Sequence, residues 1–456
     1  MSGNPEMRCR RTCGTHGPLT RRHFLFGGIG AASATLLRTP ADAAVATANV
    51  EPRKTARCCI FINMNGAPSQ LDTFDPKDGP WNPRDADIRD YTGGIRLSRR
   101  YFPMLSQLTS ELCVLRSVSS WEAAHTRGQF YMQTAHSFNP AFAPVLPHVG
   151  AVLSYELGAK GSLPPFFSLA PAQDEQRQGF LPGVNTPFSF VPDPGGLSNL
   201  RHDFWGDQSK PFFDNSFALL QDLDAPLRAA PWSDDVAAYA SLTTQARGLI
   251  YNDAVTRVFQ FSKADDARYG GTNFARSLLT ARNIVQSNMG AVFINATQNG
   301  WDLHARQFNT QYGGTIYSQT SEFDRALGNL ILDLRASGDL ARTLIVAMGE
   351  FGRTPGPLNY NDGRDHYTAV QSALMAGGGI RGGRAIGLTD ANGAAITDPG
   401  WRGNRPIFVE DIVATLYSAM GVDWTKSIEN TPLNRRYIYI PGADTGQFGP
   451  IDEVFL

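Results

Sequence analysis

Short runs of continuously apolar residues, separated by segments with helical periodicity, are the feature that most constrains the fold of this chain. Strands that face solvent on one side alternate apolar and polar residues, whereas these runs are apolar throughout. That pattern is typical of strands in a parallel sheet that is covered on both faces. The expected buried strands are residues 58–64, 113–118, 166–169, 291–296, 344–348 and 372–376.

Helical patterns occupy much of the sequence between these strands. The clearest covers residues 316–337, where Phe323, Leu327, Leu330, Ile331 and Leu334 recur on one face and Gly338 is suited to end the helix. Strands that alternate with helices predict an α/β fold with a central, mostly parallel sheet flanked by helices. The other expected helices are residues 237–261, 273–288 and 410–420, the last of them ending at Gly421.

Residues 171–231 break this alternation. They are rich in Pro, Gly, Asp and aromatic residues and have no clear period. Because aromatic side chains favour burial, we interpret this segment as a loop-rich insertion or cap and not as a linker. Residues 44–456 are therefore expected to form a single domain that contains this insertion.

The first 43 residues have the three parts of an export signal. Arg21 and Arg22 lie in the twin-arginine pattern TRRHFL, a Gly- and Ala-rich apolar stretch follows, and residues 41–43 (ADA) offer a cleavage site. The apolar stretch is too short to span a bilayer. The alternative is a basic tail that precedes a buried Gly-rich helix. The signal predicts a periplasmic or secreted protein that meets the twin-arginine translocase already folded, which often means that a metal or cofactor is inserted before export.

The charge distribution argues against a nucleic-acid partner. The chain has 41 Lys and Arg against 42 Asp and Glu, which gives a net charge of −1. Residues 1–43 alone have a net charge of +4. The remaining chain is therefore at −5, without the basic excess that nucleic-acid binding requires. Of five cysteines, Cys58, Cys59 and Cys113 lie beyond the signal in apolar runs, where we expect buried free thiols.

Residue types that bind metals follow several of the expected strands. In an α/β sheet, ligands bind beyond the carboxyl ends of the strands, so these loops are the place for a site. Carboxylates and imidazoles together suit Zn²⁺, and oxygen-rich sets suit Mg²⁺ or Ca²⁺. Each Asp near a His has the alternative of a turn residue or a hydrogen-bonded pair. The candidate ligands are Asp72, Asp302, His304, Glu350, Asp365 and His366.

Four segments carry a resemblance to a known family. They are residues 65–77 (NGAPSQLDTFDPK), 300–304 (GWDLH), 349–355 (GEFGRTP) and 363–366 (GRDH). Together they resemble the signature segments of a large bacterial domain-of-unknown-function family, exported by twin-arginine signals and placed in the alkaline phosphatase and arylsulfatase superfamily. The resemblance extends from about Arg57 to the C-terminal region, and it implies an alkaline-phosphatase-like sandwich.

The same resemblance implies a two-metal site at which a nucleophile attacks a phosphate or sulfate ester. Asp302 and His304 resemble the ligands of the first metal, at shorter spacing. Glu350 and Phe351 stand where the superfamily has an Asp-His-Gly turn, and Asp365 and His366 are expected to supply the missing ligands. The Asp expected directly after the first strand is replaced by Asn, and Asp72 comes later.

The nucleophile is expected just after the strand at 113–118. The sulfatase cysteine motif is absent, and His125, Thr126 and Arg127 occupy the corresponding position between strand and helix. The hydroxyl of Thr126 is the candidate nucleophile, with Arg127 gripping an oxyanion. The alternative is that Thr126 only caps the helix. Arg353 and Arg364 are either further anion clamps or solvated surface groups.

These observations predict an exported, metal-dependent hydrolase of phosphate or sulfate esters, either small molecules or polymer-borne, with Zn, Mg or Ca as its divalent ions. The alternative is a non-catalytic, sulfatase-like binding protein of the cell envelope. The glycine-rich run 377–382 fits a dinucleotide-binding pattern, but no helix opens after it, which argues against that function.

Overall fold

A computed structural model describes residues 50–455, apart from 173, 174, 198, 199 and 433. The expected export signal lies outside the described residues. The core is an eight-stranded sheet in the order β12-β4-β11-β8-β1-β7-β5-β6, in which β11 alone runs antiparallel to its neighbours. Its strands are β1 (Cys58–Asn65), β4 (Leu112–Val118), β5 (Phe166–Leu169), β6 (Phe188–Phe190), β7 (Phe293–Asn299), β8 (Thr343–Met348), β11 (Gln371–Ala376) and β12 (Arg384–Ile386).

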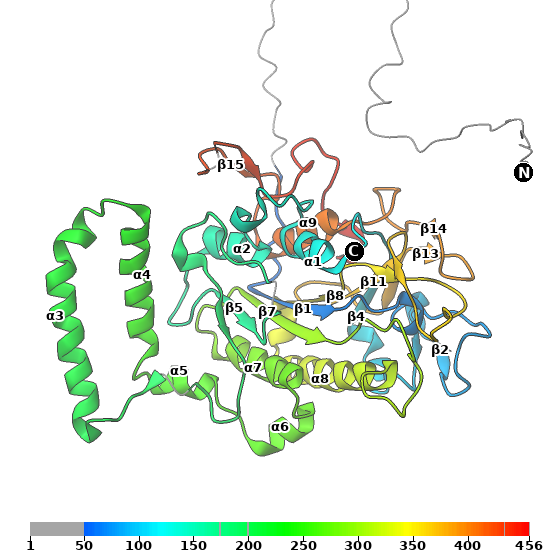
Figure 1. The fold of residues 1–456 in the computed structure, drawn as a ribbon, viewed down its shortest axis with the longest axis horizontal. Coiled ribbons are helices and arrows are strands. Elements are labelled where there is room, and N and C mark those ends of the chain that lie inside the picture. The colour runs from blue at the N-terminus through cyan, green and yellow to red at the C-terminus, as the bar shows by residue number, and fades with distance from the viewer. Residues whose placement is uncertain (1–49, 173–174, 198–199, 433, 456) are drawn as a thin grey trace, which may run out of the picture. The chain divides into compact units, whose positions relative to one another are not determined.

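Helices cover both faces of this sheet (Figure 1). One face packs on α7 and α8 and the other on α1, α2 and α9, so the molecule has two hydrophobic cores separated by the sheet. The mostly parallel α/β fold predicted from the sequence is confirmed. The described helices are α1 (His125–Thr134), α2 (Val149–Leu157), α3 (Ser209–Ala229), α4 (Asp234–Leu249), α5 (Asp253–Val258), α6 (Lys263–Tyr269), α7 (Asn273–Ser287), α8 (Ile316–Ser337) and α9 (Val409–Met420).

Strand β1 shows how the sequence divides between the two cores. Ile60 and Ile62 point to the core under α7 and α8, and Cys59 and Phe61 to the other. Successive side chains of a strand point to opposite faces, so a strand buried on both sides must be apolar at every position. Four two-stranded ladders lie outside the sheet: β2 (Ile88–Asp90) with β3 (Arg96–Ser98), β9 (Gly352–Arg353) with β10 (His366–Tyr367), β13 (Leu388–Thr389) with β14 (Ile396–Asp398), and β15 (Ser427–Ile428) with β16 (Tyr437–Ile438).

Helix α8 has the predicted boundaries. Its amphipathic face is buried, and Ser318 Oγ accepts a hydrogen bond from the backbone N–H of Thr315 at 2.9 Å, one half of a capping box. At the other end Gly338 adopts a left-handed conformation with φ 78°. Local signals at both ends therefore agree with the apolar period.

The prediction of one continuous helix over residues 237–261 is wrong, because the segment forms two helices. Tyr251 has a positive φ of 55°, and Asn252 caps a new helix through its side-chain oxygen, which accepts from the N–H groups of Ala254 and Val255. Asn caps of this kind compete with helix continuation, so the segment forms α4 and α5.

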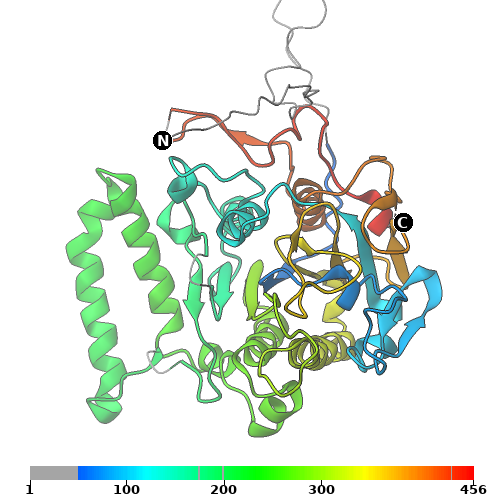
Figure 2. The same cartoon turned by 45° about the vertical axis from the view of Figure 1, so that its right-hand side comes forward.

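The segment 171–231 contains the 21-residue helix α3, which its sequence pattern did not predict. Of its eight aromatic residues, which were expected to be buried, three are exposed: Phe204 at 72%, Trp205 at 56% and Phe212 at 57%. The other five are half-buried. Helices α3 and α4 form a hairpin at the edge of the molecule, away from the sheet in both views (Figures 1 and 2).

The three cysteines of the described chain are free and buried, as predicted. Burial raises the pKa of the Cys58 and Cys113 thiols to about 12. These thiols therefore stay protonated and unreactive at neutral pH. None of the helices in the described ranges has the length and apolar character that crossing a membrane requires.

Candidate metal centre

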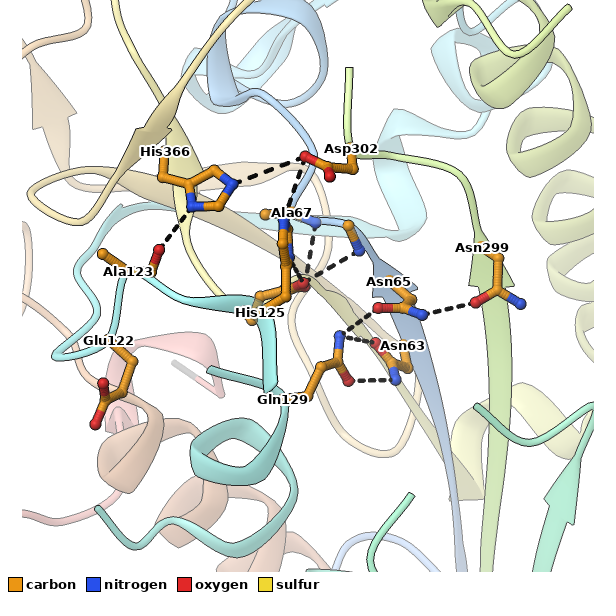
Figure 3. A network of polar contacts seen from close by, with 12 residues as sticks. Asn63, Asn65, Ala67, Glu122, Ala123, His125, Gln129, Asn299, Asp302 and His366 are labelled. Atoms are coloured by element: carbon orange, nitrogen blue, oxygen red, sulfur yellow. Dashed lines mark hydrogen bonds and ion pairs between the residues drawn. The ribbon is translucent and has the colours of Figure 1, made fainter. Parts of the chain in front are cut away.

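Three histidines and one aspartate converge beyond the carboxyl ends of the sheet strands. Figure 3 shows His125, Asp302 and His366 of this group. One ligand atom from each of His125, Asp302, His304 and His366 lies within 4.8 Å of the others. Asp302 Oδ1 is 3.2 Å from His125 Nε2 and 3.1 Å from His304 Nε2. His304 Nε2 and His366 Nε2 are 3.0 Å apart. The group is open to solvent, since the Asp302 side chain is 46% exposed.

The second ring nitrogen of each histidine is held by an oxygen. A neutral imidazole carries one proton, and an oxygen acceptor at Nδ1 fixes that proton there, so the Nε2 lone pairs point into the centre. Lone pairs that face one another and a carboxylate repel unless a cation lies between them. Metal-binding histidines are oriented in this way. The acceptors are Glu350 Oε1 for His125 at 2.6 Å, Asp365 Oδ1 for His304 at 2.9 Å and the carbonyl oxygen of Ala123 for His366 at 2.6 Å.

A tight turn after β1 fixes one of these acceptors. Gly66 and Ala67 have positive φ values of 107° and 59°, which aims both N–H groups at the buried Glu350 carboxylate, each at 3.1 Å. A Cβ at Gly66 would lie 2.5 Å from the backbone nitrogen of Asp302. Glycine is thus required both by the conformation and by the close approach of the loop that carries Asp302.

The electrostatics of the centre favour a bound cation. Hydrogen bonds to Asp302 and Glu350 raise the pKa of His125 to about 9. Burial opposes ionisation of Asp302, but hydrogen bonds from His125 and Arg353 outweigh it and hold the pKa of that carboxyl well below its usual range. The carboxylate is therefore ionised at neutral pH, and the centre attracts a proton or a metal ion.

Arg353 is buried beside the centre, not solvated. Its guanidinium donates to Asp302 Oδ1, lies 3.2 Å from His304 Nε2, and also donates to the carbonyl oxygens of Gly66 and Ala67. Arg364 is also fully buried and pairs with Asp72 at 2.7 Å. We expected these arginines to be either anion clamps or solvated surface groups. Both are instead buried and form internal ion pairs.

An amide network supports the floor of the centre, and the sequence did not reveal it. Gln129 of α1 bonds Asn63 at 2.8 Å and Asn65 at 2.9 Å, and Asn65 Nδ2 donates to Asn299 at 2.6 Å (Figure 3). Gln129 stands four residues after His125, on the same face of α1, and this spacing was the available signal. The network ties α1 to β1 and β7, and thereby positions His125 against Asp302.

The predicted metal ligands divide into three groups. Asp302, His304 and His366 meet in the centre, where His125, expected to be catalytic, joins them. Glu350 and Asp365 contact the Nδ1 atoms of His125 and His304, on the side of each ring that faces away from the centre. Asp72 is not among the four: it is buried and accepts from Gln307 and Arg364.

Thr126 and Arg127 lie on the first turn of α1, next to His125. Thr126 is exposed. Arg127 pairs with Glu122 through Nε at 2.8 Å. The structure therefore brings His125, and neither of its two neighbours, into contact with the other site residues.

Comparison with known proteins identifies a family to which the chain belongs. Residues 56–436 match the family described as "Protein of unknown function (DUF1501)". The chain belongs to this family. A search of curated proteins finds no match.

Several solved structures are similar to this chain at low sequence identity. A sulfatase from Pseudoalteromonas sp. is 13% identical, with a TM-score of 0.42 over 90% of this chain and 72% of the other. A protein of the alkaline phosphatase superfamily from Vibrio parahaemolyticus is 11% identical, with a TM-score of 0.39 over 82% and 69%. A phosphonate monoester hydrolase from Silicibacter pomeroyi is 13% identical, with a TM-score of 0.34 over 81% and 74%.

Proposed function

We propose that this DUF1501 member is an exported, metal-dependent hydrolase of phosphate or sulfate esters whose ion is held by His125, Asp302, His304 and His366. The observation that supports it is the convergence of three imidazole Nε2 atoms on one carboxylate oxygen, with each Nδ1 engaged by an oxygen. Export through the twin-arginine pathway, and a periplasmic or secreted location, are part of the same proposal.

The donor set fits zinc better than magnesium or calcium. Imidazole nitrogens and carboxylates are usual ligands of zinc, whereas Mg²⁺ and Ca²⁺ prefer oxygen ligands. One such group is present in the described part of the chain, so we propose one ion here in place of the two that the superfamily resemblance implies.

The residues around the ion have separate tasks. A bound divalent ion would act as a Lewis acid on an ester oxygen. Glu350 and Asp365 hold the rings of His125 and His304 in the ligating tautomer. Arg353 restrains the Asp302 carboxylate.

Thr126 remains the proposed nucleophile, because its hydroxyl is solvent-exposed and directly follows the ligand His125. Arg127 would grip an ester oxyanion only after leaving Glu122, with which it is paired. A Thr126→Ala variant should retain its metal and lose ester hydrolysis. If the variant hydrolyses esters at the wild-type rate, another group attacks.

Metal analysis of protein folded in the cell tests the proposed centre. Inductively coupled plasma mass spectrometry should find one equivalent of a divalent ion, zinc by preference, which the His304→Ala variant has lost. A matched control is His202→Ala, because His202 is an exposed histidine outside the group. Wild-type protein with much less than one equivalent, or a His304→Ala variant that retains its ion, would contradict the proposal.

A non-catalytic binding protein of the cell envelope is the second candidate. It is favoured by the contacts of Arg127 with Glu122, which leave the centre without an engaged oxyanion clamp. A screen of aryl phosphates and aryl sulfates with Zn²⁺, Mg²⁺ or Ca²⁺ separates the two. Turnover that disappears in a His366→Ala variant supports the hydrolase, whereas a metal-loaded protein without turnover supports the binding function.

A further inference from the structure

Helix α3 carries a stripe of apolar side chains that the described part of the chain leaves exposed. Leu219 and Leu223 are 60% and 69% exposed, and Phe212 and Pro226 are exposed as well. Successive members of this α3 stripe are seven, four and three residues apart, a spacing that puts all four on one side of a helix. A monomeric protein rarely exposes a large apolar patch, and such a patch marks a surface that contacts another protein or a membrane.

The α3 stripe is distinct from the face of α3 that packs on α4. Phe213 and Phe217 are half-buried, and the guanidinium carbon of Arg247 from α4 lies 5.3 and 5.8 Å from the centres of their rings. At 3.6 residues per turn, these two side chains point about 120° away from the stripe around the helix axis. Packing within the hairpin therefore does not explain why the stripe is apolar. The hairpin lies at the edge of the molecule in both views, where a partner can reach it (Figures 1 and 2).

An aromatic cluster extends the stripe at the start of α3. The ring centres of Phe204 and Trp205 are 4.9 Å apart, and those of Trp205 and Phe212 are 5.6 Å apart. Since an aromatic side chain can bury about 150–250 Å², these three partly exposed rings offer about 400 Å². The two leucines and Pro226 bring this surface close to the ~800 Å² that each partner buries in a stable protein interface.

The charge of the hairpin separates a protein partner from a membrane. Residues 203–247 contain seven Asp against three Lys and Arg, a net charge of −4. Helices that lie on membranes carry Lys and Arg on their polar face, because the lipid surface is anionic. Such a surface repels this acidic hairpin. Between two protein surfaces the same charges lie outside the stripe and are screened by salt, so that apolar contact determines the association.

The stripe has the symmetry that a contact between two identical chains requires. A two-fold interface must match itself, because the same patch is used by both copies. Phe212 and Pro226 lie seven residues before and seven residues after Leu219. If two α3 helices pair antiparallel with Leu219 at the axis, the large ring of Phe212 in each copy meets the small ring of Pro226 in the other.

We propose that a second copy of this chain covers the α3 stripe, and that the protein dimerises through antiparallel α3 helices centred on Leu219. The same arrangement brings the exposed Trp232, which follows α3, to the end where Phe204 and Trp205 of the other copy lie. The proposal does not depend on the hydrolase function, since no residue of the metal centre belongs to the hairpin.

Sedimentation equilibrium of the full chain at micromolar concentration tests the dimer. The wild type should have twice the mass of one chain. Leu219→Glu should raise the dissociation constant by about 100-fold or more, because two carboxylates would face each other across the axis. Val191→Glu is the matched control: Val191 is also an exposed apolar residue but lies outside the stripe, so this variant should dimerise like the wild type.

Cross-linking tests the position of the axis. Leu219→Cys should form a disulfide-linked dimer on mild oxidation, because only a residue close to the axis meets its own copy. Cys58, Cys59 and Cys113 are buried, and the wild type, oxidised in the same way, is the control for all cysteines already in the chain. Val191→Cys should not cross-link.

Three results would overturn the proposal. The first is a wild type that stays monomeric at micromolar concentration. The second is a dimer that Leu219→Glu does not weaken, or one in which Leu219→Cys does not cross-link. The third is a monomer that binds vesicles of phosphatidylcholine and phosphatidylglycerol and loses this binding in Leu219→Glu, since lipid would then be the partner of the stripe.

Discussion

At the scale of single residues, the candidate metal centre depends on groups that would not touch a bound ion. Glu350 is fully buried and accepts from His125, Gly66 and Ala67, so its two oxygens are engaged by three donors. It sets the ring orientation of His125 and presents a negative charge behind it. Such partners are positioning residues, and their loss weakens a metal site without removing a ligand.

Replacing Glu350 with Gln should lower zinc affinity by about 10- to 100-fold. The amide matches the carboxylate in size, but its NH₂ group would face the N–H donors of the turn after β1. Affinity is measured by competition with a chromogenic chelator. Glu122→Gln is the matched control, because Glu122 is a buried glutamate near α1 that pairs with Arg127 and with none of the centre's histidines. Equal affinity of Glu350→Gln and the wild type would show that Glu350 does not orient His125.

Asp324 illustrates how a buried carboxylate makes stability depend on pH. It accepts from the N–H groups of Met104 and Leu105 at 2.9 and 2.8 Å, yet burial raises its pKa to about 6. Because this pKa lies above that of the unfolded chain, folding favours the protonated form. The carboxyl therefore lowers the free energy of unfolding as pH rises from about 4 to about 6.

An Asp324→Asn variant should gain stability relative to the wild type over that pH range, by about 2 kcal/mol between pH 4 and pH 7. Urea unfolding followed by circular dichroism at several pH values measures the difference. Taking the variant minus the wild type cancels the contributions of other titrating groups. A difference that is constant with pH would show that Asp324 ionises normally in the folded protein.

At the scale of elements, the turn between β1 and the following loop joins the sheet to the metal centre. Gly66→Ala would place a Cβ 2.5 Å from the backbone nitrogen of Asp302, in a conformation with φ 107°. Neither the turn nor the loop can yield without moving Asp302 or the N–H groups that hold Glu350. We expect this variant to lose most of its zinc and to unfold more easily, as measured by metal analysis and thermal unfolding.

Gly338→Ala is the control for backbone strain alone. Gly338 is also left-handed, with φ 78°, but a Cβ there would meet nothing within 4 Å. This substitution should cost about 1 kcal/mol in stability and leave the zinc content unchanged. If Gly66→Ala resembles Gly338→Ala in both zinc content and stability, the close approach of Gly66 to Asp302 does not matter for zinc binding.

The elements also show which features were predictable from the sequence. Helix α8 agrees to the residue because its apolar period, N-terminal cap and Gly338 give the same boundaries. The direction of β11 was not predictable, since apolar character reports burial and not strand polarity. The break at Tyr251 and the exposed helix α3 depend on capping and on packing at the molecule's edge, which periodicity does not reveal.

The site was predictable to a similar degree. The rule that ligands lie beyond strand ends selected Asp302, His304 and His366, and their side chains lie together in the structure. It did not distinguish residues that face the centre from those behind it, because the choice depends on ring orientation. Glu350, predicted as a ligand, hydrogen-bonds to the Nδ1 of His125 instead. His125, predicted as catalytic, belongs to the group of candidate ligands.

At the scale of the whole molecule, the sheet and its two cores support the centre, and the α3–α4 hairpin lies at the edge of the molecule (Figures 1 and 2). Ala238 and Leu242 of α4 lie against the loop at Gly183. The two ends of the hairpin segment meet where it joins the rest of the fold. There the N–H of Tyr251 donates to the carbonyl oxygen of Leu200 at 3.0 Å. The Tyr251 hydroxyl donates to the carbonyl oxygen of His202 at 2.6 Å. Helix α3 presents exposed Leu219 and Leu223 to solvent. The hairpin therefore adds little to the cores.

Replacing residues 203–247 with a short Gly-Ser linker should leave the fold and the zinc content intact. The excision keeps Leu200 and Leu249, which are buried in the core beside α7, and loop closure between ends that already meet costs little. The expected result is one equivalent of zinc, with a thermal midpoint within a few degrees of the full chain, since a loss of about 1 kcal/mol shifts a large domain only slightly. Failure to fold, or loss of zinc from a folded variant, would show that the hairpin braces the strand ends from outside. The sheet and its flanking helices would then not suffice to position Asp302 and the three histidines.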